Sequence, residues 1–240
     1  MAAEYDDTFT ESVVGRTMRA AVWRRLAVRF GAGDHVLELN AGTGIDAAWL
    51  EQRGVRVLAT DASEGMVQVA RRRGVQAEVL DAADVASLLV GPFDGALSNF
   101  GGLNCVEDLP AVAQGLASKV QPGGSVVLCV MGPVVPWEWL WYLARLQPGK
   151  AFRRLRASTE WRGLTIRYPS ARALRHTFEP WFACERTWAL GALVPPSYAE
   201  PLARRVPWLV RGLDRVERLT ETWAPMVAIA DHYVLELRRR

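Results

Sequence analysis

The sequence has few cysteines and few histidines, and this scarcity removes several classes of site from consideration. The three cysteines are odd in number without a CxxC spacing, and the three histidines form no ligand cluster. A disulfide framework and a structural zinc site are therefore unsupported, and no metal is expected. A reducing cytosol fits this usage, so we predict a cytoplasmic protein. The six residues are Cys105, Cys129, Cys184, His35, His176 and His232.

A signal for export and a long apolar run are also missing. The N-terminus is acidic over Met1–Asp7, where a signal peptide needs positive charge and then an apolar run. The most apolar stretch, Val126–Trp137, is shorter than the ~18–20 residues that cross a bilayer, and two prolines interrupt it. We expect neither secretion nor a transmembrane segment.

The chain lacks a strong excess of charge of one sign. Its 29 Lys and Arg residues against 26 Asp and Glu residues give a net charge of +3, too small to imply a nucleic-acid partner. With 50% apolar and 23% charged residues in 240 positions, the composition is that of an ordinary globular protein. We predict a single α/β domain with insertions over residues 1–240, present as a monomer or a homodimer.

Short apolar strands alternate with helical segments through the first half of the chain. Helical spacing over 12–30 is followed by the strand pattern Val36–Leu39, the glycine-rich turn Asn40–Gly44 and a helix to Glu51. Four more strands are expected near 55–60, 75–80, 93–98 and 125–130, with helices near 63–73, 83–89 and 109–120. This alternation predicts a parallel sheet covered by helices on both faces.

After Met131 the alternation ends and the chain becomes rich in Trp, Arg and Pro. We expect a helix at 169–178, a strand at 182–192, mostly helix at 196–223 and a final strand at 233–238. Two segments of this half, 132–165 and 195–226, are predicted to be insertions that cap a substrate pocket.

The turn between the first strand and its helix matches a nucleotide-binding fingerprint. Gly42 and Gly44 begin the pattern GxGxxA, which lets a ligand approach the backbone and the helix N-terminus closely. Asp61 follows at the end of the second strand, where a carboxylate can accept hydrogen bonds from both ribose hydroxyls. Two cofactors therefore compete, NAD and S-adenosylmethionine.

Glu38 favours the second cofactor. A carboxylate at the end of the first strand would repel a diphosphate, but it suits the sulfonium and ammonium of S-adenosylmethionine. A buried unpaired carboxylate is costly, so a purely structural role for Glu38 is hard to explain. A full helix before the first strand can also cover a small cofactor. Asp46 is expected to be only a first-turn acid that favours the helix dipole.

With these features the sequence resembles the class I S-adenosylmethionine-dependent methyltransferases. The resemblance covers roughly residues 5–131 and the last strand. The family usually has Gly where this chain has Asn40, a modest departure because Asn tolerates left-handed backbone. The motifs that carry it are Val36–Gly44, Leu58–Ser63, Leu80–Ala82 and Val120–Gly124.

The resemblance implies a three-layer αβα Rossmann-like fold, with a seven-stranded, mostly parallel sheet, an antiparallel last strand and helical cap insertions. Residues 1–34 would form an N-terminal helical lid and 35–131 the cofactor-binding core. Within the core, the methionine end of the cofactor would contact Glu38, Asn40, Ala41, Gly42, Thr43 and Gly44. Its ribose and adenine would contact Asp61, Ala62, Met66, Asp81 and Ala82. Its donor methyl would lie beside Asn99 and Phe100.

The acceptor is expected beyond the carboxyl ends of the later strands. Asn104, Trp137 and Trp141 are the predicted substrate contacts, because the two tryptophans share one face of a helix begun by Pro136. A catalytic base is optional in methyl transfer, and His176, Tyr168, Glu138 and His232 are the candidates if one is needed.

These features predict methyl transfer to an O, N or C atom of a small, apolar or aromatic molecule. Two alternatives remain open: an NAD(P)-dependent oxidoreductase, and a non-catalytic protein that binds S-adenosylmethionine and regulates a partner.

Overall fold

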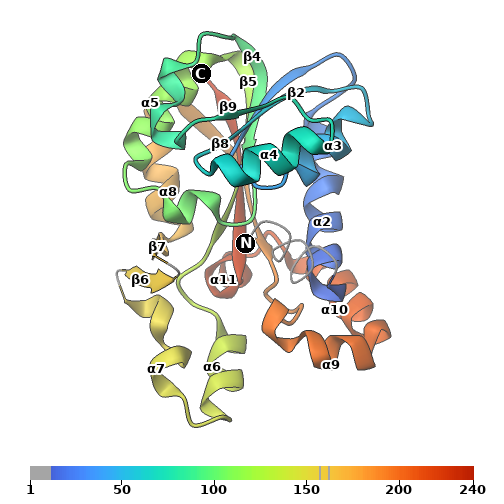
Figure 1. Cartoon of the computed structure of the whole chain (residues 1–240). Helices are drawn as coiled ribbons and strands as arrows, with labels where there is room; N and C mark the ends of the chain where they lie inside the picture. The colour runs from blue at the N-terminus through green and yellow to red at the C-terminus, as the bar shows by residue number, and fades with distance from the viewer. Residues whose placement is uncertain (1–11, 157, 162) are drawn as a thin grey trace.

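Seven strands form one twisted sheet in the order β3-β2-β1-β4-β5-β9-β8 (Figure 1). The computed structural model describes residues 12–156, 158–161 and 163–240. Strands β1 to β5 are parallel, and β9 is antiparallel to both of its neighbours, as predicted. The strands are β1 (His35–Leu39), β2 (Arg56–Asp61), β3 (Ala77–Val79), β4 (Phe93–Ser98), β5 (Val120–Met131), β8 (Phe182–Leu190) and β9 (His232–Arg239).

Helices cover both faces of this sheet. On one face lie α2 (Val13–Arg29), α3 (Ile45–Glu51) and α4 (Glu64–Arg72). On the other lie the 3₁₀ helix η2 (Ala82–Ser87), α5 (Leu109–Lys119) and α8 (Ala171–Phe178). The predicted three-layer arrangement is confirmed, although the short helix expected near 83–89 is a 3₁₀ turn.

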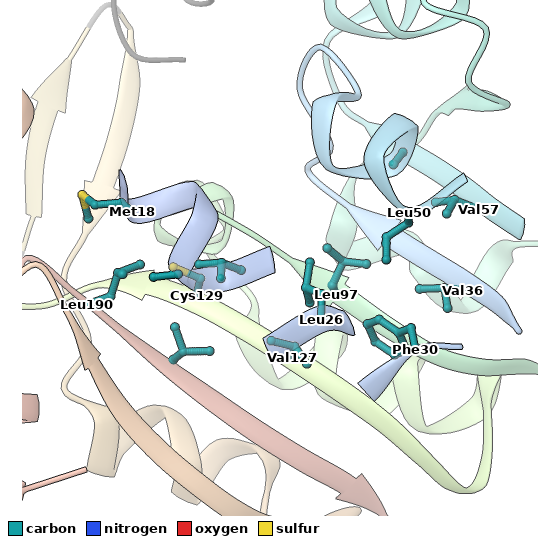
Figure 2. Packing of buried hydrophobic residues seen from close by; sticks show 14 of the residues in the cluster. Met18, Leu26, Phe30, Val36, Leu50, Val57, Leu97, Val127, Cys129 and Leu190 are labelled. Atoms are coloured by element: carbon teal, nitrogen blue, oxygen red, sulfur yellow. The ribbon is translucent and has the colours of Figure 1, made fainter. Parts of the chain in front are cut away.

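The core follows from alternation along the strands. In β1, Val36 packs under α2, while its neighbour Leu37 faces α5 and η2. Figure 2 shows Leu26 of α2 and Phe30, the residue just after this helix, close to Leu97 and Val127 of the sheet. The helix before the first strand is therefore part of the hydrophobic core. The first eleven residues of the predicted lid lie outside the described residues.

The first insertion contains two short helices and a hairpin. The hairpin was not predicted, because its residues are half-buried or exposed and show no buried alternation. Its elements are α6 (Pro136–Leu143), α7 (Pro148–Ala151), η4 (Arg153–Leu155), β6 (Ser158–Trp161) and β7 (Leu164–Arg167).

The second insertion is fastened to the N-terminal helix. The Glu200 carboxylate accepts hydrogen bonds from the first backbone N–H groups of α2, Val13 at 2.8 Å and Val14 at 3.2 Å. Both insertions extend from the end of the sheet where the parallel strands finish, at the bottom of Figure 1. The second insertion contains η5 (Ser197–Ala199), α9 (Glu200–Arg205) and α10 (Pro207–Thr220), and α11 (Ala224–Ile229) follows just before β9.

None of the helices among the described residues has the length and apolar character that crossing a membrane requires.

Candidate functional site

The glycine turn after β1 is tied to the end of β2. The Gly42 N–H donates to Asp61 Oδ2 at 2.9 Å, and the Ala41 N–H donates to the carbonyl oxygen of Thr60 at 2.9 Å. Asn40 has a φ of 53°, so this position is left-handed and suits the asparagine that replaces the usual glycine. At Gly44, an added Cβ would lie 2.8 Å from the Ala70 Cβ, so only glycine lets α4 pack this closely.

Asp61 lies where the sequence predicted it, at the carboxyl end of β2. Its second oxygen, Oδ1, accepts the Ser63 N–H at 2.9 Å, while the cap of α4 is Ser63 itself. Burial raises the pKa of Asp61 although both N–H bonds act to lower it. Each carboxylate oxygen keeps further acceptor capacity, so Asp61 can hold the turn and still accept bonds from ligand hydroxyls.

Glu38 is a buried carboxylate with an unused oxygen. It is 1% exposed, and its Oε2 has no hydrogen-bond partner within the described part of the chain, although the Ala47 N–H bonds to the carboxylate. Burial, and then the nearby charge of Asp46, raise the pKa of Glu38 well above its ordinary value. A cationic ligand group at this oxygen would remove that penalty, so the residue fits the ammonium of a bound amino-acid moiety.

Asp46 is not merely a first-turn acid, and that expectation is wrong. Its carboxylate accepts bonds from Arg19 Nη1 and Trp23 Nε1, each at 2.6 Å, and from Asn99 Nδ2 at 2.8 Å. It therefore joins α2, the start of α3 and the end of β4 at one buried point. The available signal was the four-residue spacing of Arg19 and Trp23 beside the apolar stripe of α2.

The predicted adenine side lies at the neighbouring strand ends. Met66 is half-buried on α4, and Ala82 is buried at the start of η2, whereas Ala62 is exposed. Asp81 is also exposed, and its Oδ1 accepts the Ala83 N–H at 2.9 Å as the cap of η2. This cap accounts for one oxygen of Asp81, and contact with adenine stays a prediction.

Asn99 and Phe100 mark the end of β4. Asn99 Oδ1 accepts the Phe100 N–H at 2.9 Å, and Phe100 has a φ of 47° that turns the chain sharply. The Phe100 ring lies 4.8 Å from the Arg19 guanidinium and meets the ring of His232 edge-on at 5.8 Å. Phe100 thus connects the buried hydrogen-bonded group around Asp46 to a second cluster of polar side chains.

This second cluster joins α6, η4 and the start of β9. Arg154 Nη2 lies 2.6 Å from Asp231 Oδ1 and 3.0 Å from Glu138 Oε1, and Arg153 Nη2 donates to the same Glu138 oxygen at 2.7 Å. His232 Nδ1 lies 3.1 Å from Asp231 Oδ2. Burial acts to raise the pKa of Asp231, but Arg154 and His232 outweigh it and hold that pKa below its ordinary value.

Three of the four candidate bases meet around this cluster. Glu138 and His232 belong to it, and the Tyr168 ring lies 5.3 Å from the Arg154 guanidinium. The structure separates His176 from them: its side chain is 87% exposed on α8, next to Glu179. Because Glu138 already accepts hydrogen bonds from both arginines, its role in the structure is that of an ion-pair partner, and a role as a base stays a prediction.

Asn104 is explained without a substrate. It is fully buried in η3 (Gly102–Cys105), and its Nδ2 donates to the carbonyl oxygens of Met131 at 3.1 Å and Arg167 at 2.6 Å. Its Oδ1 accepts the Met131 N–H at 2.8 Å. Its amide therefore joins the ends of β5 and β7, and the expectation that it contacts substrate gains no support.

The tryptophans of α6 are half-buried, so they lie neither fully in the core nor fully at the surface. The Trp141 ring packs on Tyr198 of the second insertion, with centroids 5.6 Å apart, and the Arg145 guanidinium covers it at 3.5 Å. Trp139 points elsewhere, onto Phe152 at 5.6 Å. The two insertions thus meet through Trp141 and Tyr198.

Within the described residues, no group of three or more His, Cys, Asp or Glu side chains is arranged to hold a metal ion.

Known proteins share this domain and fold. Residues 36–124 match the model of a methyltransferase domain. The chain is 36% identical over 141 residues to a demethylmenaquinone methyltransferase of Clavibacter sepedonicus, covering 57% of each chain. It is 35% identical over 160 residues to the same enzyme of Paenarthrobacter aurescens, covering 63% of this chain and 61% of that one. The matches thus span little more than half the length of these relatives.

A solved S-adenosylmethionine-dependent methyltransferase from Mesorhizobium loti superposes with a TM-score of 0.58 at 20% identity, covering 97% of this chain and all of the other. At that identity the likeness concerns the fold. Together with the domain match, it confirms the resemblance seen in the sequence: the chain contains a methyltransferase domain and has the fold of the class I S-adenosylmethionine-dependent methyltransferases.

Proposed function

We propose that this protein transfers the methyl group of S-adenosylmethionine to a small, apolar or aromatic molecule. The observation that carries the proposal is Glu38, a buried carboxylate with an unused oxygen beside a glycine turn. An NAD(P)-dependent oxidoreductase would need to bring a diphosphate to this carboxylate, at a cost in repulsion. The domain match also favours methyl transfer over that alternative.

The residues that would hold the cofactor are those that the family resemblance implies, and their positions at the strand ends support these roles. Glu38 would bind the ammonium of the methionine moiety, Asp61 the ribose hydroxyls, and Met66 with Ala82 the adenine. Asn99 and Phe100 would flank the donor methyl. The bound cofactor supplies a methyl group already activated on a sulfonium, so the chain's main work is to align the acceptor and to exclude water.

The acceptor would lie between the end of β4 and the two insertions. Half-buried Trp137 and Trp141 supply aromatic surface there, which suits a flat or apolar molecule. The relatives named above act on demethylmenaquinone by their names, so a quinone or quinol ring is one acceptor of this kind to test. The cap role of residues 132–165 and 195–226 is part of this proposal, as is the lid role of residues 1–34.

A binding comparison tests the cofactor. S-adenosylmethionine and S-adenosylhomocysteine should raise the melting temperature, and NAD and NADP should not, because a ligand that binds only the native state stabilises it by mass action. Stabilisation by NAD alone would refute the assignment. A protein that binds the cofactor but forms no S-adenosylhomocysteine with any acceptor screened would instead favour the non-catalytic alternative.

A further inference from the structure

Arg154 carries no spare hydrogen-bonding group. Its Nη1 donates to the carbonyl oxygens of Gly132 at 3.2 Å and Asp231 at 3.0 Å, its Nη2 bonds to Asp231 Oδ1, and its Nε donates to Glu138 Oε1 at 3.1 Å. The guanidinium therefore connects α6 to the start of β9. Because its donors are used, Arg154 is a support for this region and not the group that would recognise a ligand.

Glu138 is held on one side only. Its Oε1 receives Arg153 and Arg154, whereas its Oε2 is buried and has no partner among the described residues. The residue as a whole is 1% exposed. A buried carboxylate oxygen without a donor is expensive, so this oxygen can receive a hydrogen bond from a ligand.

Tyr198 has a second buried polar group without a described partner, and it lies against the side of α6 that carries Glu138. Its hydroxyl is buried and has no hydrogen-bond partner in the described chain. Its ring packs on Trp141 at 5.6 Å and on Tyr142 at 5.4 Å, which follow Glu138 by three and four residues and so share its side of α6. Burial, and then the Glu138 charge, raise the pKa of Tyr198, so its hydroxyl keeps its proton and can donate.

The cationic side chains of this cluster already have partners. The carboxylates of Glu138 and Asp231 face the guanidinium groups of Arg153 and Arg154, which are already paired with them. Among the described residues of this cluster, Arg153, Arg154 and His232 each already pair with a carboxylate, so a neutral ligand fits better than a phosphate or carboxylate. The rings of Trp141 and Tyr198 add aromatic surface around it.

The cluster also reaches the predicted position of the donor methyl. Asp231 pairs with Arg154 and lies beside His232, whose ring meets Phe100 at the end of β4. A series of contacts thus connects Glu138 to Phe100 at the end of β4.

We propose that Glu138 Oε2 and the Tyr198 hydroxyl form the polar end of the acceptor site and bind one hydroxyl group of a neutral aromatic acceptor. In this arrangement the ligand hydroxyl donates to Glu138 and accepts from Tyr198. The inference rests on the proposed function and specifies its acceptor as a phenol-type molecule. Here Glu138 and Tyr198 bind the acceptor, and no proton transfer is assigned to either.

Two probes and three variants test this subsite. 1-Naphthol and its methyl ether, 1-methoxynaphthalene, are titrated calorimetrically into the full chain saturated with S-adenosylhomocysteine. Tyr198→Phe removes one hydroxyl and keeps the ring, Tyr142→Phe is the matched control on the same ring cluster, and Glu138→Gln removes the carboxylate. Circular dichroism checks that each variant is folded.

The wild type should bind 1-naphthol about fivefold more tightly than its ether, because only the phenol can donate to Glu138. Tyr198→Phe should weaken 1-naphthol binding about fivefold, and Tyr142→Phe should leave it unchanged. Glu138→Gln should abolish the preference for the phenol, which keeps the test decisive if Tyr198→Phe does not fold.

Equal 1-naphthol affinities for wild type, Tyr198→Phe and Glu138→Gln would overturn the subsite, as would no binding to the wild type at about 1 mM. Binding of S-adenosylhomocysteine is measured first and alone. Its failure would refute the proposed function, whereas its success with unselective naphthol binding would refute only the subsite.

Discussion

The two ends of the site hold their charged groups in different ways. At the glycine turn, Asp61 accepts hydrogen bonds from two backbone N–H groups that are 19 and 2 positions away in the sequence, and Glu38 accepts one from the nearby Ala47 N–H. In the cap, Arg154 pairs with Asp231 across 77 positions and with Glu138 across 16. The first arrangement is local and made largely by backbone; the second is made by long side chains from distant segments.

This difference sets how each end should respond to substitution. A carboxylate held by backbone N–H groups can be changed with little damage to the fold, and the loss should appear in ligand binding. A buried arginine that pairs two carboxylates cannot be removed without leaving charges unpaired, and the loss should appear in stability.

The largest effect is expected from Arg154→Met. The change leaves Asp231 without its guanidinium and Glu138 with only Arg153, so the free energy of unfolding should fall by about 3–5 kcal/mol. Urea unfolding followed by circular dichroism measures it. Arg156→Met, two residues on and exposed, is the matched control and should stay within ~0.5 kcal/mol of the wild type. A loss below ~1 kcal/mol at Arg154 would mean that the cap is not held by this ion pair.

The same difference explains how much the sequence could predict. The strand, turn and helix that place Glu38, Gly42 and Asp61 lie within one short stretch, so their spacing shows both the fold and the cofactor end. The cluster around Glu138 could not be predicted in this way, because Arg153 and Arg154 follow α7 and Asp231 lies 77 positions beyond Arg154. Asp46 was misjudged for the same reason: its partner Arg19 comes from the preceding helix.

Glu38→Gln should show the opposite signature to Arg154→Met. Loss of the charge should weaken binding of S-adenosylmethionine by at least about tenfold, since a charged hydrogen bond contributes ~1.5–3 kcal/mol. Without ligand, the variant should be as stable as the wild type or more stable near neutral pH. Calorimetry and urea unfolding measure the two effects. A less stable variant with unchanged affinity would make Glu38 a structural residue.

The pH dependence follows from the raised pKa of Glu38. Its contribution to stability is full below the ordinary value of 4.5 and is lost as the pH rises through the higher folded-state pKa. The wild type should therefore lose stability relative to Glu38→Gln as the pH rises above 4.5 and through the raised folded-state pKa. A constant difference between the two proteins over that range would show that Glu38 is ionised in both the folded and the unfolded chain.

Asp61→Ala should have an effect of about tenfold on cofactor binding. The ribose hydroxyls would lose their carboxylate, and the Gly42 N–H would lose its acceptor, while the cap of α4 stays with Ser63. Asp108→Ala is the matched control, because this exposed carboxylate only caps α5 through the Ala111 N–H and is not a predicted cofactor contact. Unchanged calorimetric affinity of a folded Asp61→Ala protein would leave Asp61 with a purely structural role.

The smallest loss of stability is expected in the aromatic part of the cap, where no charge is buried. The double change Trp137→Ala and Trp141→Ala removes half-buried rings and the packing of Trp141 on Tyr198, a pair worth ~0.5–1.5 kcal/mol beyond its buried area. Trp208→Ala is the control, because that ring is 66% exposed on α10. Affinity for S-adenosylhomocysteine should hold, since Glu38 and Asp61 are untouched, while turnover should fall through a higher KM if the rings bind the acceptor or a lower kcat if they align it. If the two rings instead belong to the hydrophobic core, each change should lower the free energy of unfolding by about 3–5 kcal/mol, and the melting temperature would collapse. A folded double variant with full turnover would refute both roles and place these rings at the surface, which would leave the polar Glu138 end as the whole of the acceptor recognition in the cap.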